Sequence, residues 1–131
     1  YPDERYIRRM DVYGELSNQE YGHRYTKDML ALAEPPTAMI ACNSNICTGC
    51  LQAISESGLQ LGRDISLVSF DGPMWPEAIG IGVTVAFTPR AEMGAQAAAR
   101  LIELIESGEK SEPREITLGV KLIHRNSIAR L

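Results

Sequence analysis

Basic residues are in the minority in this sequence of 131 residues. It has 13 Lys and Arg against 17 Asp and Glu, which gives a formal net charge of −4. A domain that binds nucleic acid directly needs a basic face that displaces counterions from phosphates, and this balance does not supply one. No apolar run approaches the roughly 20 residues of a membrane span, and the chain opens with polar residues rather than a secretory signal. These absences indicate an acidic, soluble, globular domain.

Residues that carry metal or covalent chemistry are also scarce. The sequence has no G-x-S-x-G motif, no Walker loop and no Ser/His/Asp arrangement, and His23 and His124 lie far apart. We therefore expect no enzyme activity, no cofactor and no metal site. Cys42, Cys47 and Cys50 lie within nine residues, an odd number too clustered for a disulfide framework, which favours a reducing, cytoplasmic location. Cys47 and Cys50 form a C-x-x-C pair, but small buried core residues are the simpler interpretation.

The hydrophobic periodicity predicts alternating strands and helices. A capping box at Ser17 and Glu20 begins one helix, and Thr88 followed by a proline begins the clearest one. The predicted strands cover residues 6–13, 37–42, 65–70, 83–87 and 116–122, and the predicted helices cover residues 18–34, 44–57 and 89–107. This order predicts an α/β fold with a largely parallel sheet and helices on both faces.

Two polar side chains follow neighbouring strands of this predicted sheet. Asn43 follows the strand at 37–42, and Asp71 follows the strand at 65–70. Ligands of α/β folds collect at the carboxyl ends of parallel strands, so both residues are candidates for a binding cleft. Each has an alternative role, Asn43 as a helix cap and Asp71 as a turn residue. Trp75 lies in the following loop, where it could stack on a ligand, cover an interface or pack.

Four stretches of the chain resemble one known family. They read PTAMIACN at 36–43, DISLVSFD at 64–71, PRAEMG at 89–94 and LIHRNS at 122–127. In this order and spacing they resemble the effector-binding region of LacI/GalR bacterial transcription regulators. The sequence departs from the family at Ser44, where an acid is usual, at Gly72, where a second Asp is common, and at Thr88, where a Gln is common. These departures concern the identity of the effector rather than the fold.

The resemblance implies a fold of two similar α/β lobes, like that of periplasmic binding proteins, with a small effector in the cleft between them. Residues 1–87 would form most of the second lobe, residues 88–113 a helix and linker packed on the first lobe, and residues 114–131 a returning strand. The first lobe and the helix-turn-helix that binds operator DNA are expected to lie outside this chain. Leu16 falls where the family often places an aromatic residue against the effector. Family members dimerise through segments that correspond to 45–57 and 73–79.

These observations predict the effector-sensing and dimerising part of a transcription regulator, a repressor in the main expectation. The effector is expected to be a sugar or a nucleoside, because Asp and Asn side chains bind hydroxyl groups in pairs. Operator DNA would be bound only through the helix-turn-helix outside the chain, and no membrane partner is expected. The alternative is an exported solute-binding protein of a transporter, which shares the two-lobed fold. The three cysteines and the motif-level match argue against that alternative.

Overall fold

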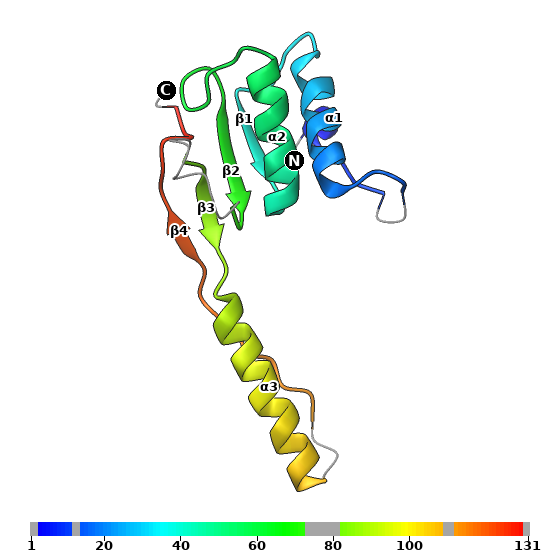
Figure 1. Cartoon of the computed structure of the whole chain (residues 1–131), viewed down its shortest axis with the longest axis vertical. Helices are drawn as coiled ribbons and strands as arrows, with labels where there is room; N and C mark the ends of the chain where they lie inside the picture. Colours follow the sequence, from blue (N-terminus) through cyan, green and yellow to red (C-terminus); the bar gives the residue numbers. More distant parts are fainter. Residues whose placement is uncertain (1–2, 12–13, 73–81, 109–111, 130–131) are drawn as a thin grey trace. The chain divides into compact units, whose positions relative to one another are not determined.

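A computed structural model describes residues 3–11, 14–72, 82–108 and 112–129 of the chain (Figure 1). The chain forms two compact units. Unit 1 consists of Tyr1–Phe87 together with Leu122–Leu131, and unit 2 consists of Thr88–Lys121. The polypeptide therefore leaves unit 1 after the third strand, builds unit 2 and then returns to complete unit 1.

The sheet has four strands in the order β1-β2-β3-β4. β1 is Ala38–Ala41, β2 is Ser66–Phe70, β3 is Thr84–Phe87 and β4 is Lys121–Ile123. β1 pairs in parallel with β2, and β2 pairs in parallel with β3. The chain comes back along β3 in the opposite direction (Figure 1). The predicted α/β class with a largely parallel sheet is confirmed.

Two helices of unit 1, α1 (Asn18–Leu30) and α2 (Ser44–Glu56), pack closely against each other. The predicted capping box starts α1, because the Ser17 hydroxyl accepts from the Glu20 N–H while the Glu20 carboxylate accepts from the Ser17 N–H. Gly22 and Gly49 allow the close approach, since a Cβ on either one would collide with the backbone of the other helix. The helices therefore touch backbone to backbone.

The core of unit 1 lies between these helices and one face of the sheet. Alternate strand residues point into it, Met39 and Ala41 from β1 and Leu67 from β2, and all three are buried. The helices contribute Met29, Cys47, Cys50 and Ile54. On the other face of the sheet, Ile40 is 73% exposed, so the described helices of unit 1 cover one face. The sequence predicted helices on both faces, because few charged residues occur in these strands, but among the described residues of unit 1 the helices lie on one face.

The predicted strand at 6–13 is wrong for the residues that the structure describes. A short 3-10 helix, Glu4–Tyr6, stands at its start, and residues 7–11 have no regular structure. The N–H groups of Tyr6 and Ile7 bond to the carbonyl groups of Asp3 and Glu4. β-branched and aromatic composition predicts a strand, but these local turn bonds take the first donors that a strand would need.

The segment after β4 ties β2 to β3. The Ser127 side chain is fully buried, and its Oγ donates to the Leu67 carbonyl oxygen at 2.6 Å and accepts from the Thr84 N–H at 2.8 Å. The Asn126 Oδ1 accepts from the Gly82 N–H at 2.9 Å. Side chains of the LIHRNS stretch therefore form hydrogen bonds with backbone groups of β2 and β3 and of the residue Gly82 before β3.

Unit 2 is dominated by a single long helix, α3 (Arg90–Ser107). Gly108 ends it in a left-handed conformation with φ 63°. The predicted start is wrong by one residue: Pro89 is the N-cap instead of the first helical residue, and no side chain caps the helix. Of the predicted strand at 116–122, β4 retains the last residues, while 112–120 has no regular structure.

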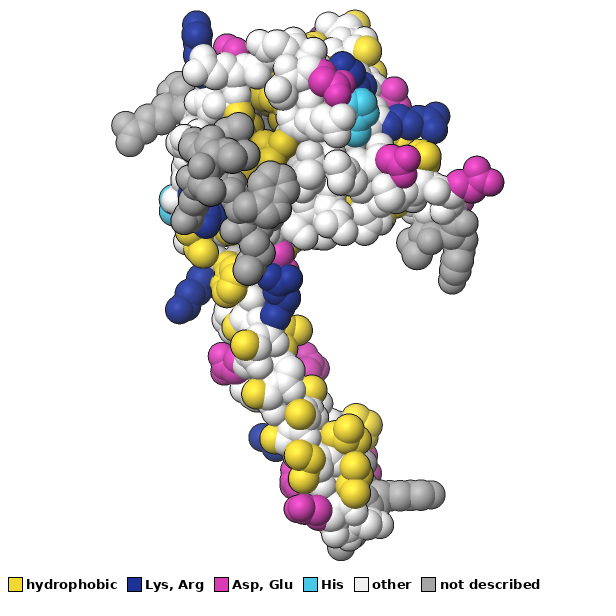
Figure 2. Space-filling model, in the orientation of Figure 1, with side chains coloured by type: hydrophobic (Ala, Val, Ile, Leu, Met, Phe, Trp, Pro, Cys, Tyr) yellow, Lys and Arg dark blue, Asp and Glu magenta, His cyan; other side chains and the backbone are white. Residues whose placement is uncertain are grey.

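The apolar stripe of α3 is exposed. None of its residues is buried, and Met93, Leu101 and Ile105 are 51%, 58% and 71% exposed. Figure 2 shows the hydrophobic side chains along this helix. Although the stripe is apolar, no helix among the described residues combines the length and hydrophobicity needed to cross a membrane.

Candidate functional site

Asn43 lies between the end of β1 and the start of α2. It is half-buried, and its Oδ1 accepts from the Ile46 N–H at 2.9 Å, which makes it the N-cap of α2. The capping role is therefore real, but it uses only the carbonyl oxygen of the side chain. Within the described residues, no hydrogen bond is formed by the amide nitrogen, which is the group that could donate to a ligand.

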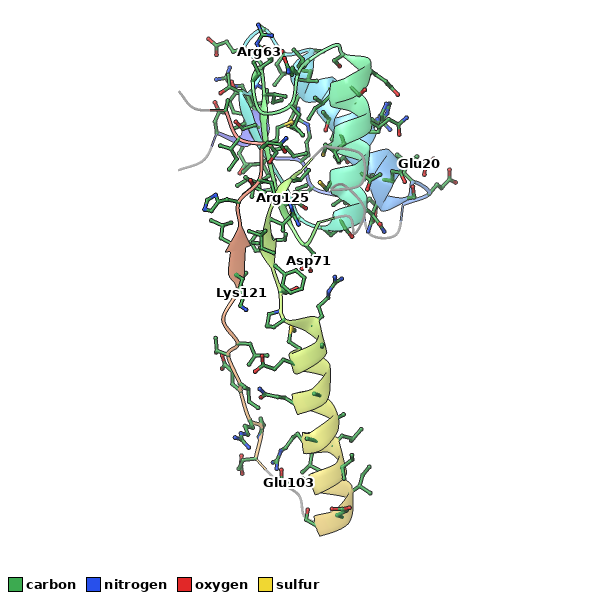
Figure 3. The ribbon with its side chains drawn as sticks, turned by 60° about the vertical axis from the view of Figure 1, so that its left-hand side comes forward. Glu20, Arg63, Asp71, Glu103, Lys121 and Arg125 are labelled. Atoms are coloured by element: carbon green, nitrogen blue, oxygen red, sulfur yellow. The ribbon has the colours of Figure 1, made fainter. Side chains whose placement is uncertain are left out.

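Asp71 follows β2 directly and has a left-handed backbone with φ 50°. Asp adopts this conformation more readily than most residues, and Gly72 comes next. The Asp71 N–H donates to the Ala86 carbonyl oxygen at 3.1 Å, so β2 and β3 stay in contact up to this point. Figure 3 shows Asp71 at the opposite end of β2 from Arg63. Asp71 is therefore held at the carboxyl edge of the sheet, as its position in the sequence predicted.

Ser69 contacts both strand ends, a role that the sequence interpretation missed. Its side chain is fully buried, and its Oγ lies 2.8 Å from the Asp71 carbonyl oxygen and 3.4 Å from the Asn43 carbonyl oxygen. The hydroxyl has a single proton, so its short bond goes to the Asp71 carbonyl oxygen, and the Asn43 carbonyl oxygen lies beside it at the outer limit of hydrogen-bond distance. The available signal was the period-2 pattern of β2, which puts a hydroxyl on the same inward face as Leu67, where it needs partners.

Leu16 comes just before α1 in the chain. It is half-buried and lines a hollow of about 460 Å³ together with side chains of α1 and with Gln52 of α2. Neither Asn43 nor Asp71 contributes to that hollow. Trp75 lies outside the described residues. The structure therefore places Asn43 and Asp71 at adjacent strand ends, and the roles of Leu16 and Trp75 stay predictions.

Two phenylalanines end strands at the same edge of the sheet. Phe70 is the last residue of β2 and Phe87 the last residue of β3, and they are 50% and 40% exposed. They are the two Phe residues of the whole sequence. Phe70 pairs with Ala86, so the two rings point to opposite faces of the sheet. An exposed ring at this edge could cover the C–H face of a polyol. The sequence interpretation did not select them because each also fits an ordinary strand position.

The buried cysteines are poor candidates for chemistry. Cys47 is fully buried, and burial raises the pKa of its thiol to about 11. Burial also raises the pKa of Cys50, which is 4% exposed. Thiols with raised pKa values stay protonated near neutral pH and are weak nucleophiles. Among the residues that the structure describes, no group of three or more His, Cys, Asp or Glu side chains could hold a metal ion.

The sequence pattern of the periplasmic binding protein-like domain matches residues 1–128. The chain belongs to this family. Similar curated proteins are transcriptional regulators. The HTH-type transcriptional regulator KdgR of Bacillus subtilis is 34% identical over 97 residues, which are 74% of this chain and 28% of that protein. The arabinose metabolism transcriptional repressor of Geobacillus stearothermophilus is 36% identical over 94 residues, 72% of this chain and 26% of that protein.

Solved structures of LacI regulators have the same fold as this periplasmic binding protein-like domain. A putative LacI regulator from Bacillus cereus subsp. cytotoxis superposes with a TM-score of 0.77 at 28% identity, covering 83% of this chain and 38% of that one. A LacI family regulator from Enterococcus faecium with bound ribose gives a TM-score of 0.75 at 28% identity, covering 86% and 41%. The resemblance to LacI/GalR regulators is confirmed, and these relatives are transcriptional regulators rather than enzymes.

The periplasmic binding protein-like chain is shorter than its relatives. It spans 26% to 35% of the length of three of the curated relatives that it matches. The match falls on the effector-binding part of these regulators.

Proposed function

We propose that the chain is the effector-sensing and dimerising part of a cytoplasmic LacI-type transcription regulator. In this proposal unit 1 is most of the second lobe, and residues 88–113 form the helix and linker that pack on a first lobe. Operator DNA is bound by a helix-turn-helix elsewhere in the regulator. A small molecule in the cleft between the lobes changes the relative population of closed and open forms and so the spacing of the DNA-binding elements.

The observation that carries this proposal is the pair Asn43 and Asp71 at the ends of adjacent parallel strands, with the Ser69 hydroxyl bonded to the Asp71 carbonyl oxygen. A carboxylate accepts from two hydroxyls of a sugar, and the amide nitrogen of Asn43 donates to a third oxygen. Phe70 offers its ring to the C–H face. This combination favours a sugar or nucleoside effector. The ribose bound to the regulator from Enterococcus faecium is consistent with this class.

Self-association is proposed through the outer side of α2. Asn45, Gln52, Ser55 and Glu56 are exposed on this helix, while Cys47, Cys50 and Ile54 face the core. The second segment proposed for the interface, 73–79, lies outside the described residues. A dimer would place two effector sites under one pair of DNA-binding elements, which is how a symmetric operator is bound.

Calorimetry on the complete regulator tests the effector site, with D-ribose and adenosine as the first probes. Asp71→Ala should lower the affinity for the probe that binds by about 1.5–3 kcal/mol, the usual contribution of a hydrogen bond to a charged group. Asp28→Ala is the matched control, because Asp28 is exposed on α1 and has no partner among the described residues. Equal affinities of the two variants would reduce Asp71 to a turn residue. An export signal ahead of residue 1, instead of a helix-turn-helix, would favour a transporter's solute-binding protein.

A further inference from the structure

A second cavity in unit 1 is lined by neither Asn43 nor Asp71, although Cys42 and Ile46, on either side of Asn43 in the chain, are among its lining residues. It has a volume of about 100 Å³ and is enclosed by side chains from residues 6–10, α1, β1 and α2. Its walls are mainly apolar and include Met10, Met29 and Met39 with the ring of Tyr25. The Tyr25 hydroxyl is engaged elsewhere, since it donates to the Arg9 carbonyl oxygen at 3.1 Å. The walls therefore suit a hydrocarbon group and not a sugar.

Arg8 provides a positive charge at this cavity. Its two neighbours are paired with acids, Arg5 with Asp3 at 2.8 Å and Arg9 with Glu4 at 3.0 Å. Arg8 is half-buried and lines the cavity, and its Nη1 donates to the carbonyl oxygens of Arg5 and Ile7 at 2.7 and 3.1 Å. Within the described part of the chain, no carboxylate forms an ion pair with Arg8. Its other N–H groups remain as donors for an anion.

Thr26 of α1 also lines the cavity, but it is fully buried. Its Oγ1 has almost no accessible surface and forms no hydrogen bond among the described residues, so a ligand in the cavity does not reach this hydroxyl. Arg8 is therefore the group that an anion would bind. A cluster of waters would need several polar partners, whereas this cavity offers apolar walls and few such groups.

We propose that this cavity binds a small monocarboxylate with a short hydrocarbon tail. The tail lies among the methionines, and the carboxylate binds the Arg8 guanidinium, whose paired N–H groups match the geometry of a carboxylate. A cavity of ~150 Å³ accommodates benzene, so a volume of about 100 Å³ suits a tail of roughly three to four carbon atoms. The proposal is independent of the sugar or nucleoside site and adds a second class of ligand to unit 1.

Calorimetry of butyrate binding to the 131-residue chain tests the proposal. Butyrate should bind, and Arg8→Gln should weaken binding by about tenfold or more, because it removes a charge-assisted pair. Arg9→Gln is the matched control, since Arg9 is the neighbouring arginine, is paired with Glu4 and does not line the cavity. It should leave the affinity unchanged.

The unmodified chain gives a second test that needs no variant. Acetate lacks the tail, 1-butanol lacks the charge and octanoate exceeds the volume, so each should bind more weakly than butyrate. Cys42 is exposed and lines the same cavity, so butyrate should also slow its alkylation by iodoacetamide. Equal binding of butyrate and butanol, equal affinities of the Arg8 and Arg9 variants, or no butyrate binding at all would overturn the proposal.

Discussion

Unit 1 and unit 2 both contain helices with an apolar face, yet the two units use that face differently. In unit 1, α1 and α2 bury residues such as Met29 and Ile54 against a sheet. In unit 2, α3 is longer than either and buries none of its residues, with Ile105 71% exposed. Local sequence pattern is similar in the three helices, so it does not decide burial. Burial is decided by whether a second layer of helix or sheet packs on the apolar face, and the described residues of unit 2 contain no such layer.

The two units also differ in the hydrogen bonds that their side chains form. In unit 1, Ser69 and Ser127 are fully buried and bond to backbone groups of neighbouring segments. In unit 2, α3 has side-chain bonds between near neighbours, such as Gln96 with Glu92 and Arg100 with Glu103. The buried Ser127 links, which span tens of residues, belong to unit 1.

Truncation of a large side chain should give the largest difference in unfolding free energy between the two units. Leu67→Ala removes a fully buried side chain of β2 and should lower the free energy of unfolding by about 2–5 kcal/mol. Leu101→Ala removes one that is 58% exposed on α3, and its effect should stay within about 0.5 kcal/mol. Urea denaturation of the 131-residue chain measures both. A comparable loss in the two variants would mean that α3 is covered in solution.

Removal of a buried hydroxyl should give a smaller effect. Ser127→Ala leaves the Leu67 carbonyl and the Thr84 N–H without their bonds, which should cost about 1–3 kcal/mol of unfolding free energy. Ser55→Ala, on the exposed side of α2, is the control and should change little. The same denaturation assay applies, and similar stabilities for the two variants would show that the link between β2 and β3 does not depend on this hydroxyl.

The smallest expected effect is the loss of stability in acid that comes from a surface pair, His23 of α1 and Glu56 of α2. The Glu56 Oε2 lies 2.8 Å from the His23 Nε2, and this contact, with a bond from Gln52, lowers the pKa of Glu56 from 4.5 to about 2. A carboxyl group with a lowered pKa in the folded state contributes stability above its unfolded pKa and loses it as the pH falls. The stabilisation should therefore be complete above about pH 4.5 and fade toward pH 2.

Glu56→Gln should remove that part of the pH dependence, measured as the urea midpoint between pH 5 and pH 2. Glu106→Gln, on the exposed side of α3, is the control, because Glu106 forms no ion pair among the described residues. Its pH profile should follow that of the unmodified chain. A profile for Glu56→Gln that also follows the unmodified chain would contradict the assignment.

Signals between near neighbours predicted much of this fold. The capping box at Ser17 and Glu20 and the cap at Asn43 act over three residues, and both are present. Strand positions 38–41 and 66–70 fall inside the predicted ranges, because apolar runs flanked by turn residues indicate buried strands. The parallel order of those strands also predicted that Asn43 and Asp71 lie at the same edge of the sheet.

Features that depend on distant partners were not predictable in the same way. The contact of the Ser69 hydroxyl with the Asn43 carbonyl oxygen spans 26 residues and the bond from Ser127 to Leu67 spans 60, so no local pattern reveals them. The wrong strand at 6–13 has a related cause. Composition shows which residues tolerate an extended backbone, but a strand also needs a neighbour that accepts its hydrogen bonds.

The link through Ser127 has a consequence for the order in which the chain is assembled. Ser127 lies 60 residues after Leu67, and all of unit 2 is synthesised between β3 and the segment that bonds to it. A nascent chain that has just completed β3 still has open polar groups at Leu67 and Thr84, in a sheet without its last strand. Contacts this distant in sequence form slowly, since a long loop must close first. Unit 1 therefore reaches its final state only after translation has passed residue 127, and until then its strands are exposed to other chains.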